Sequence, residues 1–315
     1  MPSPPGSKLQ NHGQQPTVNG SPNFHHGFFY LIGCGPNDPQ TATLQALETM
    51  ARMDAILAPA RQARLFADYI GGIPIPFDPW EGFWDYQGKH FATLSPEESK
   101  LFRQNRARLL GDRLGEIRAM LDKGLDVGLL EFGNPCLFGP GQSYAEQLKP
   151  QEVIVIPGMG ADAAAMAALK ASILPSHEAR FLLQAAPFVL TGQGLKPDMS
   201  LDEPSPEAQE LLSLLAKQEH SAIFYMALAD APRLFEMLRR HLPADLPCAA
   251  VYWAGDSERQ RVLRGTLESL PAKLAEDPER FMGLLLIGRF LEGQPFTAAH
   301  NRSPAMAEAA HGEKS

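Results

Sequence analysis

Five short turns rich in glycine, alanine or proline stand where apolar runs of the sequence end, and these positions could bind a ligand through the backbone. They are Gly33-Cys34-Gly35-Pro36, Phe132-Gly133-Asn134-Pro135, Pro157-Gly158-Met159-Gly160, Tyr225-Met226-Ala227 and Ala254-Gly255-Asp256. Because the carboxyl ends of parallel strands face one crevice, we expect the turns to surround a single cleft. Small residues also let a ligand approach the backbone closely. The pattern therefore predicts a site for one bulky ligand.

The first turn does not have the sequence of a dinucleotide-binding loop. That loop requires a third glycine three residues after the second, and an acidic residue at the end of the next strand. Asp38 occupies the third-glycine position, and the next predicted strand ends at Ala58 and Pro59 without a carboxylate. A nicotinamide or flavin site is therefore disfavoured, and an ordinary nucleotide-type methyltransferase loop loses support for the same reason.

Strand and helix patterns alternate around these turns. Apolar runs predict strands at 28–32 and 55–57, a helix pattern begins at Asp38 and Pro39, and a long helix is predicted from Glu97 to about Lys123. A second series of strands and helices begins after residue 176. This alternation predicts an α/β protein, and we expect two α/β domains with mainly parallel sheets and a ligand cleft between them.

The expected organisation has four parts. We predict a disordered tail at 1–26, an N-terminal α/β domain at 27–172, a C-terminal α/β domain at 173–293 and a flexible tail at 294–315. The first tail is rich in Pro, Gly, Asn and Gln and lacks the apolar segment of a secretory signal. The segment 73–91 carries two of the three tryptophans among many prolines and glycines, which predicts a loop whose role the sequence leaves open.

The composition argues against several other classes of protein. The chain has 315 residues and a net charge of -8, whereas a protein that grips nucleic-acid phosphates needs clustered Lys and Arg. A run of about 18 apolar residues is missing, so we expect no membrane span. Three cysteines without CxxC spacing fit reduced thiols in the cytoplasm. The histidines show no metal-ligand spacing, and we expect no metal site.

The ordered motifs resemble those of the tetrapyrrole methylase family. The run "YLIGCGPNDPQTATLQALETMARMDAIL" is similar to the family's first strand, turn and helix, and "GLLEFGNPCLFGPG" is similar to its Gly-Gly-Asp-Pro turn. "VIVIPGMGADAAAMAAL" resembles its Val-Pro-Gly turn, while "AIFYMALADAPRLFEML" and "PCAAVYWAGDSERQRVLRGTLESL" resemble its later strand ends. The resemblance covers residues 28 to 290, in the family's order.

The resemblance implies a methyltransferase that binds S-adenosylmethionine between its domains, methylates a porphyrinoid or corrinoid ring and forms a homodimer. It places the cofactor contacts at Pro36, Phe132, Gly133, Asn134, Leu137, Gly160, Ala161, Met226 and Gly255. Asp38 matches the family's aspartate at the first turn and is the candidate catalytic base, if the acceptor must lose a proton. The same residue is a candidate helix N-cap.

Two residues depart from the family pattern. Asn37 stands where glycine is usual, and Asn134 stands where the second turn usually has aspartate. Asn tolerates a positive φ better than most residues, so the first change can preserve the turn. The second change removes a charge beside the ligand. Two alternatives therefore stay open: a different acceptor, such as a peptide, or a protein that binds the cofactor without transferring its methyl group.

Overall fold

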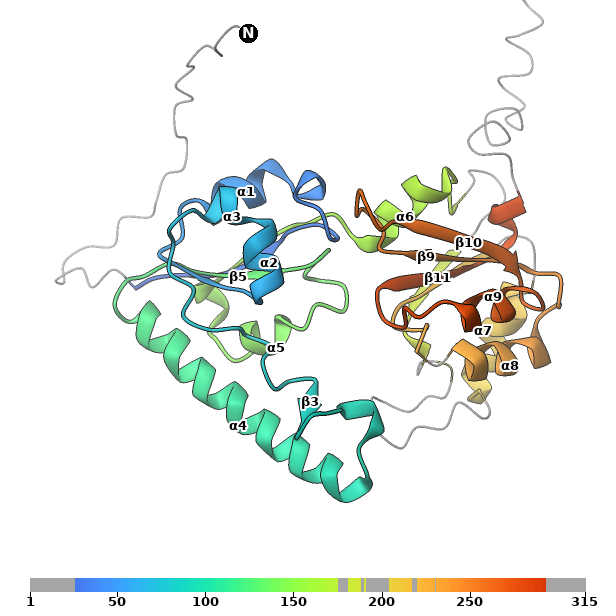
Figure 1. Ribbon diagram of the computed structural model, residues 1–315, viewed down its shortest axis with the longest axis horizontal. Coiled ribbons are helices and arrows are strands. Elements are labelled where there is room, and N and C mark those ends of the chain that lie inside the picture. The colour runs from blue at the N-terminus through green and yellow to red at the C-terminus, as the bar shows by residue number, and fades with distance from the viewer. Residues whose placement is uncertain are drawn as a thin grey trace, which may run out of the picture.

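The chain folds into two lobes that lie side by side, each built on one larger β-sheet (Figure 1). The structure is a computed structural model, and it describes residues 26–174, 181–187, 190, 204–216, 220–229 and 231–292. The predicted tails at 1–26 and 294–315 lie outside the described residues, apart from His26.

The N-terminal lobe contains a parallel sheet with the strand order β2-β5-β1-β6. Its strands are β1 (Phe29–Gly33), β2 (Ala55–Leu57), β5 (Val127–Glu131) and β6 (Val153–Ile156). One face is covered by α1 (Leu44–Met50), α2 (Ala60–Leu65) and α3 (Ala67–Ile70), and the other by α4 (Pro96–Leu121) and α5 (Gln142–Ala145). Strands β1, β2 and β5 are wholly buried, as their continuous apolar sequences predict for a parallel sheet between two helical layers.

Capping residues fix where the helices of this lobe begin. The predicted long helix is confirmed as α4, which starts with a capping box: Ser95 Oγ accepts the Glu98 N–H, and the Glu98 carboxylate accepts the Ser95 N–H. The helix predicted at Asp38 is different. Asp38 caps only a short 3-10 helix, η1 (Pro39–Thr41), and α1 begins at Leu44 because Thr43 provides a second N-cap.

The segment 73–91, predicted as a loop, contains a small hairpin. Its strands are β3 (Asp85–Tyr86) and β4 (Lys89–His90), and the 3-10 helix η2 (Phe91–Thr93) follows. Phe83 is buried and stacks on Tyr144, and Trp80 contacts both rings. These aromatic contacts hold the segment against the N-terminal lobe. At the end of β4, away from the hairpin turn, the His90 ring lies 5.2 Å from the Phe281 ring of the other lobe.

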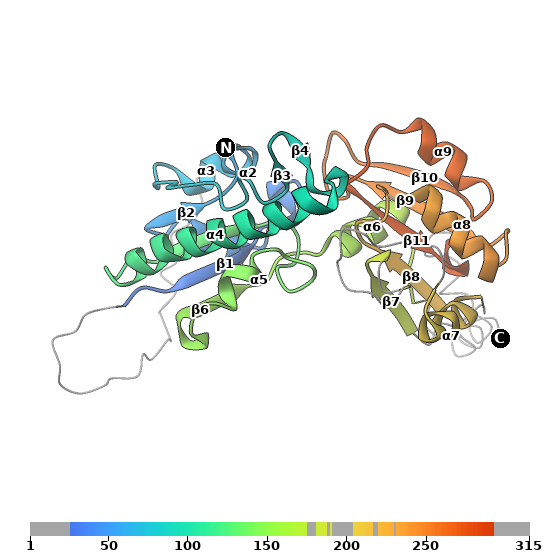
Figure 2. The same cartoon turned by 90° about the horizontal axis from the view of Figure 1, so that it is seen from below.

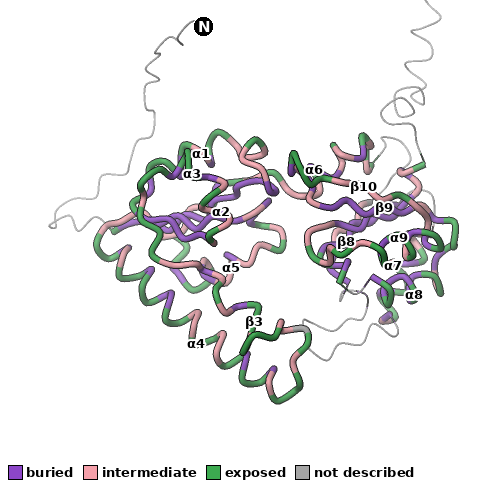
Figure 3. Tube along the Cα trace, viewed as in Figure 1, coloured by how far each residue is buried: buried purple, intermediate pink, exposed green. Residues whose placement is uncertain are grey.

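The C-terminal lobe contains a sheet with the order β10-β9-β11-β8-β7. Its strands are β7 (Phe181–Ala185), β8 (His220–Phe224), β9 (Pro247–Tyr252), β10 (Arg261–Thr266) and β11 (Gly283–Ile287). One face packs against α7 (Pro206–Leu215), α8 (Ala231–His241) and α9 (Leu270–Glu276), and the other against α6 (Ala161–Leu169) and η5 (Arg289–Glu292). The central strands of both sheets form the buried interior of their lobes (Figure 3).

This second sheet is not mainly parallel, which corrects the prediction for the C-terminal domain. Only β7 and β8 pair in parallel, whereas the pairs β8–β11, β11–β9 and β9–β10 are antiparallel. No helix separates β9 from β10, and these two strands run in opposite directions. Helix α9 then connects β10 to β11, and β11 runs in the same direction as β10. The start of β11 therefore lies at the same edge as the ends of β8 and β9.

Helix α6 follows the last strand of the N-terminal sheet but packs on the C-terminal sheet. Ala164, Ala165 and Leu169 belong to the same buried cluster as Val251 and Leu286, and α6 lies beside β9 and β11 in both views (Figures 1 and 2). The chain therefore crosses between the lobes at residues 157–160. The domain division after residue 172 stays a prediction, although the contacts of α6 belong to the second lobe.

Candidate functional site

The three turns of the N-terminal lobe interlock through their backbones. Gly133 N–H donates to the carbonyl of Gly35 at 2.9 Å. A Cβ placed on Gly158 would lie 2.2 Å from the Gly133 oxygen and 2.6 Å from the Gly33 carbonyl carbon, closer than real Cβ atoms approach backbone. These contacts require glycine, and they bring the ends of β1, β5 and β6 together.

A cavity of about 290 Å³ lies between these turns and the C-terminal lobe. This volume is at the lower end of the range for small-molecule sites. The lining is mostly apolar side chains and backbone, and it comprises Asn37, Phe132, Gly133, Asn134, Leu137, Phe138, Gly160, Ala161, Tyr225, Met226, Val251, Ala254, Phe281, Met282, Gly283 and Leu284. Both lobes therefore contribute to one site.

Most of the residues predicted to contact a cofactor meet at this cavity. Of the nine predicted residues, seven line it: Phe132, Gly133, Asn134, Leu137, Gly160, Ala161 and Met226. Pro36 and Gly255 do not line it and instead pack on each other across the lobes, because a Cβ on Gly255 would lie 2.8 Å from the Pro36 oxygen. The predicted set is thus brought together, with two members in the contact between the lobes beside the cavity.

Asp38, the predicted catalytic residue, does not line the cavity. Its Oδ1 accepts the Gln40 N–H at 2.9 Å, which is the N-cap role that the sequence also suggested. Its Oδ2 accepts the hydroxyl of Ser257, in the C-terminal lobe, at 2.8 Å. The observed contacts of Asp38 therefore cap a helix and link the two lobes.

The two asparagines that depart from the family pattern both have defined local roles. Asn37 adopts a φ of 71°, as its predicted tolerance of positive φ requires. Its Nδ2 donates to the Ala254 carbonyl across the lobes, whereas its buried Oδ1 has no hydrogen-bond partner. The Asn134 Oδ1 accepts the Cys136 N–H at 3.0 Å, as a carboxylate could, so the amide preserves the turn.

Strained backbone is concentrated at the cavity. Asn37, Phe138 and Met226 line it, and they are three of the six non-glycine residues with positive φ in the described part of the chain. Met226 and Phe138 are also unusually exposed for large apolar residues, at 52% and 44%. Such strain persists where the surrounding structure imposes it, and it clusters at ligand sites. The backbone here holds apolar side chains at the cavity rather than in a core.

Tyr225 forms part of the cavity wall from the end of β8. Its ring lies 5.1 Å from that of Phe138, and its buried hydroxyl has no hydrogen-bond partner. Burial, together with the nearby Asp162, raises the pKa of this hydroxyl, so it stays protonated at neutral pH. A protonated hydroxyl without a partner is a donor available to a ligand after a small side-chain movement.

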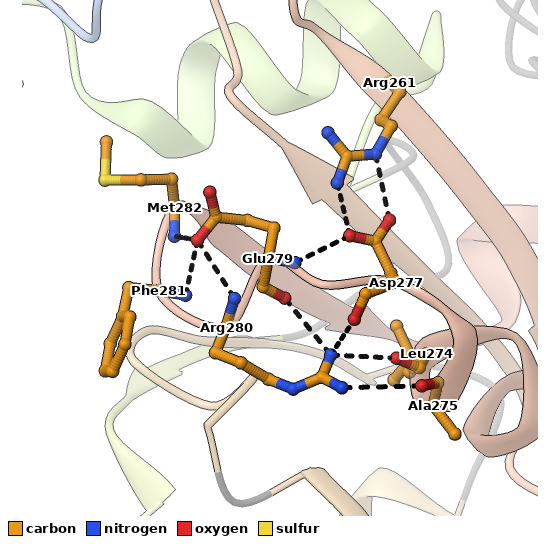
Figure 4. A network of polar contacts seen from close by, with 8 residues as sticks. All are labelled: Arg261, Leu274, Ala275, Asp277, Glu279, Arg280, Phe281 and Met282. Atoms are coloured by element: carbon orange, nitrogen blue, oxygen red, sulfur yellow. Dashed lines mark hydrogen bonds and ion pairs between the residues drawn. The ribbon is translucent and has the colours of Figure 1, made fainter.

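The sequence did not predict the segment Phe281–Leu284, which lines the cavity at the start of β11. The Glu279 carboxylate accepts the N–H groups of Arg280, Phe281 and Met282 at 3.0, 2.9 and 3.1 Å (Figure 4). Arg280 in turn donates to carbonyls at the end of α9, including that of Leu274 at 3.1 Å. This network fixes the loop that presents the 58% exposed Phe281. The signal in the sequence is the acidic run before the strand, which could satisfy a turn of free N–H groups.

The described residues contain free thiols, but neither a metal-binding cluster nor a membrane-spanning helix. In the described ranges, no three His, Cys, Asp or Glu side chains gather closely enough to hold a metal ion, and no helix has the length and apolar character of a membrane span. Cys34, Cys136 and Cys248 are free thiols, and burial raises the pKa of Cys34 and Cys248. These two thiols are therefore unreactive at neutral pH.

Curated relatives of similar sequence are siroheme synthases. That of Pseudomonas fluorescens (strain SBW25) is 30% identical over 274 residues, which cover 86% of this chain and 52% of the relative. That of Nitrosomonas europaea is 28% identical over 278 residues, with coverages of 87% and 51%. The chain thus spans about half the length of these relatives.

Solved structures with the same fold are methyltransferases. A cobalamin biosynthetic enzyme, cobalt precorrin-4 methyltransferase, has a TM-score of 0.64 at 19% identity, covering 87% of this chain and 99% of that one. Uroporphyrin-III C-methyltransferase from Thermus thermophilus, complexed with S-adenyl homocysteine, has a TM-score of 0.56 at 18% identity, with coverages of 84% and 99%. At this level of identity the likeness establishes the fold.

The chain also matches the model of a whole family. The sequence model of the tetrapyrrole (corrin/porphyrin) methylases matches residues 29–271, which include the turns of both lobes. The predicted resemblance is thereby confirmed, and the chain belongs to the tetrapyrrole (corrin/porphyrin) methylases.

Proposed function

We propose that this protein is a methyltransferase that binds S-adenosylmethionine in the cavity between its lobes and methylates a tetrapyrrole ring, either a porphyrinoid or a corrinoid. The observation that carries the proposal is the convergence of turns from both lobes on one cavity. Membership of the family supports it, as does the S-adenyl homocysteine bound by the Thermus thermophilus enzyme of the same fold.

The residues at the cavity fit a bulky nucleoside whose adenosine part is uncharged. A Cβ on Gly133 would meet nothing closer than 3.9 Å, so the space before this turn is open to a ligand. The unpartnered Asn37 Oδ1 and Tyr225 hydroxyl provide an acceptor and a donor at the wall. Phe132, Leu137 and Met226 provide apolar contact. We assign the cofactor contacts to the predicted residues that line the cavity, with Pro36 and Gly255 holding the lobes in position around it.

The bound cofactor would supply an electrophilic methyl group on a positively charged sulfur. The chain's own contribution is alignment and the exclusion of water, which together can account for about 7–11 kcal/mol of a barrier to transfer between two bound groups. The interlocked glycine turns fix one side of the cavity, while Met226 and Phe281 shield the other. No activated nucleophile of the protein is needed, because the acceptor itself attacks the methyl group.

We retain Asp38 as the proposed proton acceptor for an acceptor carbon that must lose a proton. It follows Asn37, which lines the cavity, and its carboxylate is only partly buried. The bond from Ser257 holds the carboxylate at the boundary of the lobes, where an acceptor would enter.

Calorimetry with S-adenosylmethionine and S-adenosylhomocysteine tests the cofactor assignment. We expect both to bind, and the absence of binding up to millimolar concentration of either would contradict the proposal. Methyl transfer is then measured by mass spectrometry with uroporphyrinogen III, a peptide pool and RNA offered separately. Methylation of the tetrapyrrole supports the acceptor assignment. Labelling of peptide alone would overturn it, and binding without any product would indicate a protein that does not transfer the methyl group.

We further propose that the protein is a cytoplasmic homodimer. The resemblance to the family supports the dimer, and three free thiols fit a reducing compartment. Sedimentation at micromolar concentration tests the dimer, and a single monomeric species would contradict it. Fractionation of cells tests the compartment, and recovery of the protein outside the cytoplasm would contradict it.

A further inference from the structure

Arg61, on α2 of the N-terminal lobe, lies between aromatic rings of both lobes beside the cavity. Its guanidinium carbon is 5.2 Å from the centroid of Phe132, which lines the cavity, and 5.2 Å from that of Trp253 in the C-terminal lobe. Such contacts hold a guanidinium in place and favour its charged form. The side chain is still 33% exposed, so part of it is open to a further partner.

The charge of Arg61 is poorly matched by its neighbours. Its nearest carboxylate oxygen, Asp256 Oδ2, is 3.9 Å from Nη2, and this oxygen already accepts Nε and Nη2 of Arg259. Asp256 Oδ1 accepts the N–H groups of Glu258 and Arg259. Two guanidinium groups therefore share one carboxylate that is fully engaged with Arg259. The buried Nη2 of Arg61 has no hydrogen-bond partner at all.

Nearby arginines of the C-terminal lobe have good partners, which distinguishes them from Arg61. Arg261 Nε donates to Asp277 at 2.9 Å, and Arg264 Nη2 donates to the Leu169 carbonyl at 2.9 Å. Arg280 donates to the carbonyls at the end of α9. Burial, and the proximity of Arg259, lower the pKa of Arg61 against the opposing effect of Asp256. An anion that binds beside Arg61 would therefore stabilise the charged form of its guanidinium.

We propose that Arg61 determines specificity for the acceptor by binding one of its carboxylates. This inference rests on the proposed function, since it places the acceptor in the cleft next to Phe132. A hydrogen bond from a guanidinium to a carboxylate is assisted by both charges and is stronger than a neutral one. Because the two rings already hold the Arg61 side chain in place, little side-chain freedom is lost on binding. Arg61 thereby selects carboxylate-bearing rings over uncharged ones.

Binding of uroporphyrin III, followed by its visible absorbance with and without S-adenosylhomocysteine, tests the inference. We expect Arg61→Gln to weaken binding by about tenfold, the size expected for hydrogen bonds between charged groups, and to reduce the dependence of binding on salt. Arg61→Lys keeps the charge and should bind with intermediate affinity. The matched control is Arg64→Gln, an exposed arginine of the same helix, which should bind as the wild type does.

Calorimetry with S-adenosylhomocysteine on the same variants separates the outcomes. If the wild type binds this nucleoside and Arg61→Gln binds uroporphyrin III as tightly as the wild type, the inference is wrong while the proposed function stands. An equal loss of both ligands in Arg61→Gln would assign Arg61 to holding the lobes together, and that also overturns the inference. If the wild type binds uroporphyrin III but not the nucleoside, the cofactor assignment fails instead. Failure of the wild type to bind uroporphyrin III overturns the inference directly.

Discussion

The two halves of the cavity wall are built in different ways. The N-terminal half consists of glycine turns whose backbones touch, and neither Gly33 nor Gly158 has room for a side chain. The C-terminal half consists of exposed apolar side chains, Met226 and Phe281, on a strained or separately braced backbone. The first half is part of the folded core of its lobe, whereas the Met226 and Phe281 side chains of the second are more than half exposed. Changes in the first half should therefore cost stability, and changes in the second should cost binding.

The largest effect is expected for Gly158→Ala in the N-terminal half. The new Cβ would overlap backbone of Gly133 and Gly33 that cannot move aside, so we expect a loss of about 3 kcal/mol in the free energy of unfolding, measured with urea. The matched control is Gly111→Ala on α4, where a Cβ meets nothing within 4 Å. This control should gain about 0.5–1 kcal/mol because it removes a helical glycine. Equal stabilities of the two variants would contradict the interlocked turns.

Asp38→Asn tests whether Asp38 accepts a proton during methyl transfer or only caps a helix and contacts Ser257 of the other lobe. An amide caps a helix as well as a carboxylate does and can accept the Ser257 hydroxyl, but it cannot take up a proton. We expect turnover to fall by about 10² with stability and cofactor affinity unchanged, as for the loss of a general base. Turnover at the wild-type rate would restrict Asp38 to the capping and bridging roles.

Glu131, at the end of β5 in the N-terminal half, makes stability depend on pH. Burial raises the pKa of the Glu131 carboxyl to about 8, although the hydrogen bond that it accepts from Gly141 N–H acts to lower it. The folded protein therefore keeps this proton above the pH at which the unfolded chain, with a pKa near 4.5, releases it. The contribution to stability falls as the pH rises from about 4.5 to about 8 and is constant above that.

Glu131→Gln should remove this dependence. We expect the variant to match the wild type near pH 5 and to be more stable by about 3.5 kcal/mol at pH 8, measured by urea unfolding across that range. Parallel pH profiles for the two proteins would show that Glu131 is ionised in the folded state, contrary to its burial.

Met226→Gly, in the C-terminal half, should weaken ligand binding without a loss of stability. Glycine adopts the φ of 54° without strain, so we expect stability to be maintained or raised by up to about 1 kcal/mol. Removal of the exposed side chain from the cavity wall should weaken the binding of S-adenosylhomocysteine by about tenfold, since about 1.4 kcal/mol of apolar contact is lost. Unchanged affinity in calorimetry would remove Met226 from the binding site.

The sequence predicted the N-terminal half of the site better than the C-terminal half. Turns such as Gly133 and Gly160 are recognisable because close backbone contact demands small residues, and this requirement is local. The position of Phe281 depends on the direction of β11, which follows from the missing helix between β9 and β10 rather than from residues near 281. Arg61 carries no local signal, because only the packing of the two lobes brings it between Phe132 and Trp253.

Hydrogen exchange with and without S-adenosylhomocysteine tests most directly whether the two unlike halves hold one ligand. We predict slower exchange at the same time in peptides that contain 132–137 of the N-terminal lobe and in those that contain 225–226 and 281–284 of the C-terminal lobe. Protection confined to one lobe, or present only at segments remote from the cavity, would contradict a site shared between the lobes.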